Sequence, residues 1–235
     1  MATDTAVMFE GRRWPAASVL GASLNRRGEI LFSATGKGQT WNADRPLAFW
    51  RSFSALGLSD TIFDKRTDAR AKKFLSRYGD PFGQLDQRAA AGKPMMGSAA
   101  NWIPLMEALR QVAAAWDEPD EFGISAWGGD GLRAEIADKA LRKLLPVDPD
   151  GDPEIRDEIK TVYTRQGLTL WPQTLRAFMV ISATHAREHT INMRQCTYCS
   201  DWFELRRSDA VYCSPSCQAA GHKRHMTISI SNVGR

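Results

Sequence analysis

Four cysteines near the carboxy terminus are the residues of this chain best suited to chemistry. They form the pattern Cys196-x2-Cys199, thirteen intervening residues, then Cys213-x3-Cys217, and the chain has no other cysteine. A Cys-x-x-Cys pair in one tight turn can place two thiolates on adjacent corners of a tetrahedron, about 2.3 Å from a zinc ion. Because all four cysteines cluster in this way, metal ligation is expected in preference to disulfides. The spacing predicts one Zn²⁺ bound by Cys196, Cys199, Cys213 and Cys217.

Other uses of the four cysteines explain less. Buried thiols are one alternative, and a redox Cys-x-x-Cys pair is another, but the latter leaves Cys213 and Cys217 without a role. A segment of this size with few large apolar side chains cannot fold alone, whereas structural zinc contributes about 10–16 kcal/mol of apparent binding free energy. Four cysteine ligands close the coordination sphere, which favours a structural ion over a catalytic one. His222 and His225 are less expected as substitute ligands.

The residues around the cysteines predict a small module over residues 194–226. The segments 202–206 and 210–212 alternate like strands and predict a hairpin. Ser214 is a preferred N-cap and Pro215 a preferred first helical residue, so a helix should begin there. Cys217 would then lie in the first turn, where the helix dipole favours the thiolate. The turn that carries Cys196 and Cys199, here called the knuckle, would be followed by the hairpin and the helix. Together they indicate a treble-clef zinc finger, followed by a flexible tail over 227–235.

Residues 194–225 resemble the FCS-type treble-clef zinc fingers of bacterial proteins, and also the carboxy-terminal finger of the CGNR family. The resemblance is carried by Cys196-Thr-Tyr-Cys199, by Trp202-Phe203, and by the segment from Tyr212 to Ala220, which reads YCSPSCQAA. In the CGNR family the finger follows a helical domain, and the proteins are regarded as stress-response transcription regulators. The resemblance therefore implies DNA binding and transcription regulation. Cys217-Gln-Ala-Ala stands where that family has Cys-Gly-Asn-Arg.

Residues 1–193 are expected to form a mainly helical domain with a short β-hairpin, so the predicted fold class is α+β. The hairpin would pair Ser18–Leu20 with Glu29–Phe32, and Gly36-Lys-Gly-Gln-Thr40 is expected to be a turn, because it lacks the order of a phosphate loop. Apolar spacing predicts six helices, one long loop and one extended piece. The helices are expected at 47–56, 67–78, 103–116, 132–145, 154–165 and 172–192, the loop at 80–97 and the extended piece at 122–127.

Two further motifs suggest metal chemistry but are incomplete. Asp148-Pro-Asp-Gly-Asp152 begins like a calcium loop, but position six is Pro153 and position twelve is Ile159. His185-Ala-Arg-Glu-His189 has the H-x-x-E-H order of inverted zinc peptidases. The third ligand is usually a glutamate well downstream, and Glu204, inside the cysteine module, is the one glutamate that follows. No catalytic constellation is predicted, and the protein is not expected to be an enzyme.

Charge and composition permit a nucleic-acid partner. The chain has a formal net charge of +4, with 43% hydrophobic and 25% charged residues. With zinc and four thiolates included, the module itself carries only about +1. Candidate contacts to DNA or RNA phosphates are Arg206, Arg207, Lys223 and Arg224. The hypothesis of nucleic-acid binding would be strengthened if these four residues shared a face with Arg187 and Arg194.

The alternative function is a protein-interaction adaptor anchored by Trp202 and Phe203. The amino terminus lacks the basic-then-apolar pattern of a secretory signal, and the longest apolar run is too short to cross a bilayer. We therefore expect a cytoplasmic protein without a membrane partner.

Overall fold

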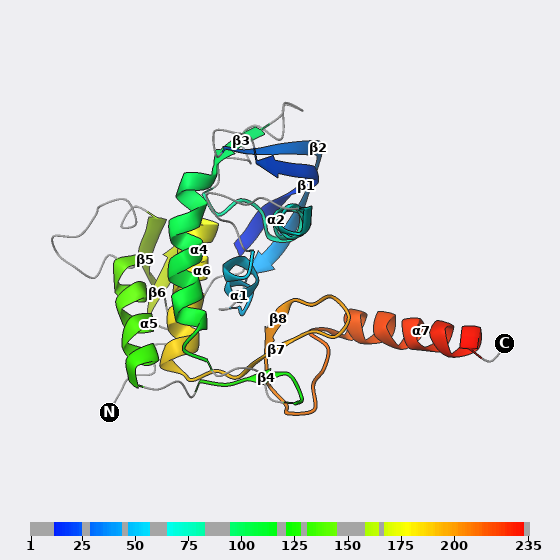
Figure 1. Ribbon diagram of the computed structural model, residues 1–235. Coiled ribbons are helices and arrows are strands. Elements are labelled where there is room, and N and C mark those ends of the chain that lie inside the picture. The colour runs from blue at the N-terminus through cyan, green and yellow to red at the C-terminus, as the bar shows by residue number, and fades with distance from the viewer. Residues whose placement is uncertain are drawn as a thin grey trace.

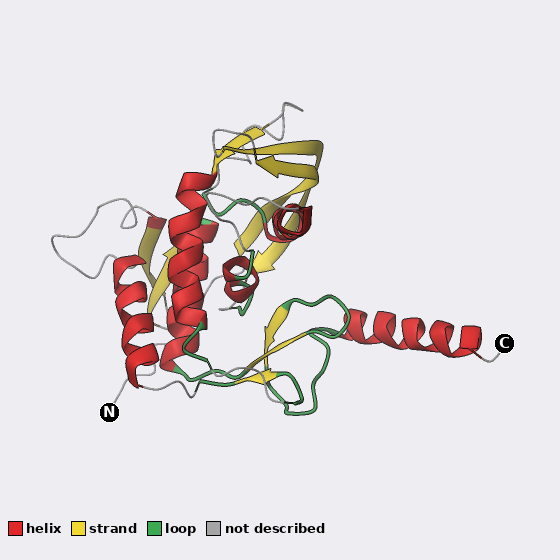
Figure 2. Cartoon of the chain, in the orientation of Figure 1, coloured by secondary structure: helices red, strands yellow, loops and turns green. Residues whose placement is uncertain are grey.

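Helices form the centre of the molecule, and small antiparallel sheets lie around them (Figures 1 and 2). A computed structural model describes residues 12–24, 29–43, 47–56, 65–82, 95–116, 121–127, 131–144, 158–164 and 167–232. The predicted α+β class is confirmed. None of the helices in these ranges is long and apolar enough to cross a membrane.

Within the described ranges, five helices build the body. They are α1 (Trp50–Ser54), α2 (Lys65–Tyr78), α4 (Ala99–Ala113), α5 (Gly131–Leu144) and α6 (Leu175–Glu188). Helix α6 is the central one, and its apolar residues from Leu175 to Ala186 are mostly buried. It begins where the Thr174 side chain accepts a hydrogen bond from the backbone N–H of Ala177 at 3.1 Å, which satisfies one of the free donors of a helix start.

The hydrophobic core lies between these helices and is rich in aromatic rings. Phe49 stacks on Tyr78 with ring centres 4.7 Å apart and lies 5.4 Å from Phe178 of α6. The ring centre of Phe53 in α1 lies 5.8 Å from the ring centre of Trp102 in α4. Because such rings bury large apolar areas and prefer offset or tilted contacts, the short α1 is fixed from several sides. Its position matters below, because Arg51 of this helix reaches the cysteine module.

Three small sheets in the described part of the chain surround the helices. The first has the order β1-β2-β3, formed by β1 (Arg12–Leu24), β2 (Glu29–Ala43) and β3 (Met95–Ser98). The second pairs β5 (Ile159–Thr164) with β6 (Gly167–Pro172). The third has the order β4-β7-β8, formed by β4 (Ile124–Ser125), β7 (Met193–Gln195) and β8 (Trp202–Glu204), and joins the body to the cysteine module.

The amino-terminal hairpin is longer than predicted. Strand β2 continues through Gly36-Lys-Gly-Gln-Thr40, so the turn predicted there is wrong. An irregularity between Ala16 and Ser18 of β1 absorbs extra residues of β2, which lets the strand pass its two glycines and remain paired. Strand β3 also lies at the end of the segment predicted to be a loop.

The helix predicted over 154–165 is wrong where the structure describes it. Residues Ile159–Thr164 form β5, because Thr161, Val162 and Thr164 are β-branched and favour an extended backbone. Glu158, just before the strand, accepts hydrogen bonds from Arg176 at 2.6 Å and from the Thr174 hydroxyl at 2.6 Å. The calcium-like segment 148–153 lies outside the described residues.

Candidate metal centre

The first cysteine pair lies in the turn of a tight β-hairpin. Strand β7 (Met193–Gln195) pairs antiparallel with β8 (Trp202–Glu204), and the turn between them carries Cys196 and Cys199. The backbone N–H of Cys196 donates to Asp201 O at 2.9 Å, and that of Ser200 donates to Cys196 O at 2.8 Å. Ser200 has a φ of 60°, which reverses the chain after Cys199.

The predicted hairpin has different strands from the observed one. We expected 202–206 to pair with 210–212, whereas β8 pairs with β7, which in turn pairs with β4 (Ile124–Ser125) of the body. The segment 205–214 is a loop that returns to the knuckle, where the Thr197 N–H donates to Val211 O at 3.1 Å. Strand β7 is therefore shared between the module and the body.

The second pair lies at the start of α7 (Pro215–Asn232), as predicted. The Ser214 hydroxyl accepts a hydrogen bond from the Cys217 N–H at 3.2 Å, which is the expected N-cap. The helix projects away from the rest of the molecule (Figure 1). It covers positions 227–232 of the predicted tail, because no proline or glycine interrupts the sequence there.

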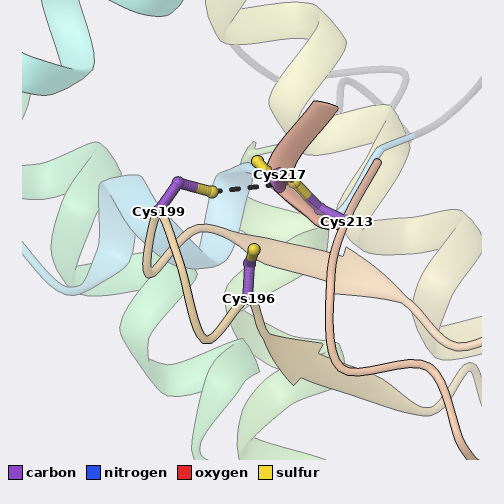
Figure 3. Close-up of side chains that lie close together, drawn as sticks. All are labelled: Cys196, Cys199, Cys213 and Cys217. Atoms are coloured by element: carbon purple, nitrogen blue, oxygen red, sulfur yellow. Dashed lines mark hydrogen bonds between the residues drawn. The ribbon is translucent and has the colours of Figure 1, made fainter. Parts of the chain in front are cut away.

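The four sulfurs converge on one point (Figure 3). The Sγ atoms of Cys199 and Cys213 are 3.6 Å apart, those of Cys213 and Cys217 are 3.5 Å apart, and all four lie within 4.8 Å of one another. A tetrahedral ion with zinc–sulfur bonds of about 2.3 Å separates its sulfurs by about 3.8 Å. The donor set and its spacing therefore fit one tetrahedral metal ion, and all four predicted ligands are brought together.

The protein alone does not hold all four sulfurs as thiolates. Burial raises the pKa of Cys199, and it brings the pKa of Cys213 to about 11. Burial also acts on Cys196, but hydrogen bonds from backbone groups of Cys199 and Cys213 outweigh it and lower its pKa to about 7. A cation among the sulfurs supplies the charge that keeps such a group deprotonated.

A buried carboxylate links the knuckle to helix α2. The Asp201 side chain is 8% exposed and pairs with Lys73 at 3.4 Å and, more closely, with Arg77. The Lys73 ammonium group also donates to the backbone oxygen of Cys199. Two cations of the body thus lie next to the centre, where they offset the negative charge that four thiolates and one divalent ion leave.

A second link is made by Arg51, which is enclosed by aromatic rings. Its guanidinium lies 3.7 Å from the ring centre of Trp202 and 5.8 Å from that of Trp116, and it donates to the Ser125 hydroxyl at 2.9 Å. Burial lowers the pKa of Arg51 to about 10, so the side chain stays charged at neutral pH and the cation–π contact persists. Trp202, a proposed interaction anchor, is thereby engaged within the chain.

Tyr212 packs against α7 at a glycine. A Cβ atom added to Gly221 would lie 2.6 Å from Cε1 and 2.8 Å from Oη of Tyr212, closer than side chains approach. The ring also lies 5.8 Å from His222. Glycine is the poorest ordinary helix former, and its presence here follows from this close contact. The contact fixes the direction in which α7 leaves the centre.

The four candidate nucleic-acid contacts separate into two groups. Arg206 and Arg207 line a hollow between body and module with Arg77, whereas Lys223 and Arg224 line another with Lys73 and Tyr198. Arg207 also pairs with Asp209 at 3.4 Å. Neither Lys73 nor Tyr198 was predicted, because nothing local connects Lys73 of α2 with the knuckle and only basic residues of the module were considered as phosphate contacts.

Arg187 and Arg194 do not share a face with these four residues, so the condition that would have strengthened the nucleic-acid hypothesis is not met. Arg194 is 4% exposed and donates to Ala210 O at 2.8 Å. Arg187 pairs with Asp138 at 3.0 Å and lies 4.0 Å from the ring centre of Trp127. Both guanidinium groups therefore serve the packing of the chain.

The H-x-x-E-H segment does not assemble a second metal group in the described part of the chain. The rings of His185 and His189 are 4.3 Å apart, and burial together with His189 lowers the pKa of His185. Among the described residues, the four cysteines are the one set of three or more acidic, histidine or cysteine side chains close enough to share an ion.

Comparisons with protein-family models, curated proteins and solved structures found no match for this chain.

We predict that Asp201→Asn lowers the free energy of unfolding by about 1–2 kcal/mol, because it leaves two half-exposed cations without their carboxylate. The matched control is Asp209→Asn, whose pair with Arg207 is exposed on both sides, and which should change stability by less than about 0.5 kcal/mol. Urea unfolding followed by tryptophan fluorescence measures both. Equal effects of the two changes would show that the Asp201 contacts do not hold the module.

We also predict that Gly221→Ala destabilises the protein, although alanine favours helix by about 1 kcal/mol. Overpacking against Tyr212 should cost about 1–3 kcal/mol and reverse that gain. The same change in a Tyr212→Ala background should be stabilising, because the clash is gone. Thermal unfolding of the four proteins gives the comparison. A stabilising Gly221→Ala in the parent chain contradicts the packing described above.

Proposed function

We propose that the four cysteines bind one structural zinc ion and that residues 194–226 form a treble-clef zinc finger. Support comes from the convergence of four sulfurs, two from a hairpin turn and two from a capped helix start. Four thiolate ligands leave no open position for a substrate, so the ion stabilises the module and performs no catalysis. The resemblance to FCS-type and CGNR-type fingers agrees with this arrangement.

The metal content of protein purified without added zinc tests this proposal. We expect one zinc per chain by mass spectrometry, and a loss of at least most of it in Cys213→Ser. Ser216→Ala is the matched control, because Ser216 lies in the first turn of α7, three residues after Cys213, and offers no thiolate. Metal-free protein whose residues 194–226 resist proteolysis as well as the zinc-loaded form would contradict the proposal.

We further propose that the protein binds nucleic acid through α7 and acts as a regulator. The observation that carries this proposal is the exposure of Lys223 and Arg224 beside Lys73 in a hollow that no acidic side chain lines. Cations arranged in this way bind phosphates, with an affinity that falls as salt rises. Arg206 and Arg207, in the other hollow, are secondary candidates.

The adaptor hypothesis has less support. Trp202 is stacked on Arg51, so this ring already has a partner within the chain. Phe203 is only partly buried and lines the hollow near Arg206, which keeps it as a possible contact for a protein. An interaction site needs such an anchor at its centre, and one half-buried ring is a weak one.

A salt titration tests the nucleic-acid proposal. We expect the protein to bind a labelled mixed-sequence oligonucleotide. The slope of log affinity against log salt concentration should become shallower by about 0.7–0.9 for each phosphate contact that is removed. The double variant Lys223→Gln/Arg224→Gln should lose about two such contacts. Lys139→Gln/Lys143→Gln on α5 is the control with the same change in charge. Equal slopes for the two variants, or no binding at low salt, would contradict the proposal.

A further inference from the structure

A shallow hollow on one side of the metal centre collects side chains from three separate segments. We call it the α2–α7 hollow, and it is lined by Lys73, Tyr198, Cys199, Ala220, Lys223 and Arg224. Lys73 comes from α2, Tyr198 from the turn between the two knuckle cysteines, and Lys223 and Arg224 from α7. The hollow thus combines three cations and one aromatic ring, and none of its lining residues is acidic.

The aromatic ring is accessible although the backbone beneath it is fixed. Tyr198 is 43% exposed, among the most exposed large hydrophobic residues that the structure describes. It lies between Cys196 and Cys199, whose sulfurs converge with those of Cys213 and Cys217. Because the backbone of this turn is already positioned, it loses little conformational entropy when a flat partner stacks on the ring.

The cations around the ring are positioned by side-chain contacts in the case of Lys73 and by the backbone of α7 in the case of Lys223 and Arg224. The Lys73 ammonium group has three hydrogens, and its two described contacts are the Cys199 carbonyl and the Asp201 carboxylate. A third donor therefore remains for a ligand. Lys223 and Arg224 follow the capped first turn of α7, and Gly221 just before them packs on Tyr212.

An exposed aromatic ring on a well-positioned turn beside several cations is a combination that binds unpaired nucleic-acid strands. Cations follow the phosphates while the ring stacks on a base, and stacking is tolerant of sequence because every base has a flat face. In a duplex these faces are covered by neighbouring base pairs, so Tyr198 would gain no stacking there.

Resting on the proposed function above, we propose that the α2–α7 hollow binds single-stranded nucleic acid, with Tyr198 stacking on a base and Lys73, Lys223 and Arg224 contacting phosphates. Helix α2 of the body is then part of the binding site, and the finger alone is an incomplete one. An acidic peptide could satisfy the cations, but it offers no flat face to the tyrosine.

The experiment measures anisotropy of the zinc-loaded full-length chain with four labelled probes. These are a mixed-sequence DNA strand, the same strand annealed to its complement, the equivalent RNA strand, and a polyglutamate peptide. We expect one or both single strands to bind more tightly than the duplex and the peptide at the same salt concentration. Tighter binding of the duplex or of the peptide overturns the inference.

Variants of Tyr198 isolate the stacking step. Tyr198→Ala should weaken single-strand binding by about tenfold or more and leave duplex binding within about twofold. Tyr198→Phe keeps the ring and should bind like the parent chain. Val211→Ala, at a residue with similar exposure, is the control for lost apolar surface. An unchanged affinity in Tyr198→Ala overturns the inference.

Variants of Lys73 isolate the contribution of the body. Lys73→Gln should lower the single-strand salt slope by about 0.7, whereas the exposed neighbour Lys72→Gln should leave it unchanged. Lys73→Arg keeps the charge and should restore the slope. Thermal unfolding of each variant measures separately how much stability the loss of the ion pair with Asp201 costs.

If the parent chain binds no probe, the proposed function itself fails. If binding depends on Lys223 and Arg224 but on neither Lys73 nor Tyr198, only this inference fails.

Discussion

Four thiolates within 4.8 Å of one another repel unless a cation lies between them. At about 4 Å and an effective dielectric constant of about 20, each pair of unit charges repels by roughly 4 kcal/mol. Burial adds to this cost at Cys199 and Cys213, because it raises their pKa values and favours the thiols. A bound divalent ion removes the conflict, and it then fixes the knuckle turn and the start of α7 in one geometry.

The body of the protein takes part in this arrangement. Lys73 and Arg77 bring positive charge to the knuckle through Asp201, Arg51 stacks on Trp202, and strand β4 pairs with β7. The module is therefore continuous with the helical core through charge, ring stacking and a shared sheet. One consequence is that the surface around the metal centre is composite. The α2–α7 hollow exists only because α2 and α7 are held on the same side of the knuckle.

The sequence predicted those features whose causes are local. Cysteine spacing located the ligands, and Ser214-Pro215 located the start of α7, because capping depends on neighbouring residues. Strand β5 was missed because the charged residues before it resemble a helix start, whereas its β-branched residues favour a strand. The pairing of β7 with β4, the contact of Lys73 with a residue 126 positions away, and the burial of Arg194 are tertiary effects. None of them leaves a periodic signal in the sequence.

We infer that one ion with four sulfur ligands organises the carboxy-terminal part of the chain. X-ray absorption at the zinc edge of the protein as purified measures this ligand set. We expect a single shell of four sulfur atoms at about 2.3 Å. A shell that contains nitrogen or oxygen neighbours at about 2.0–2.1 Å would show that a histidine, a carboxylate or water completes the site. That result would contradict a closed structural centre formed by Cys196, Cys199, Cys213 and Cys217.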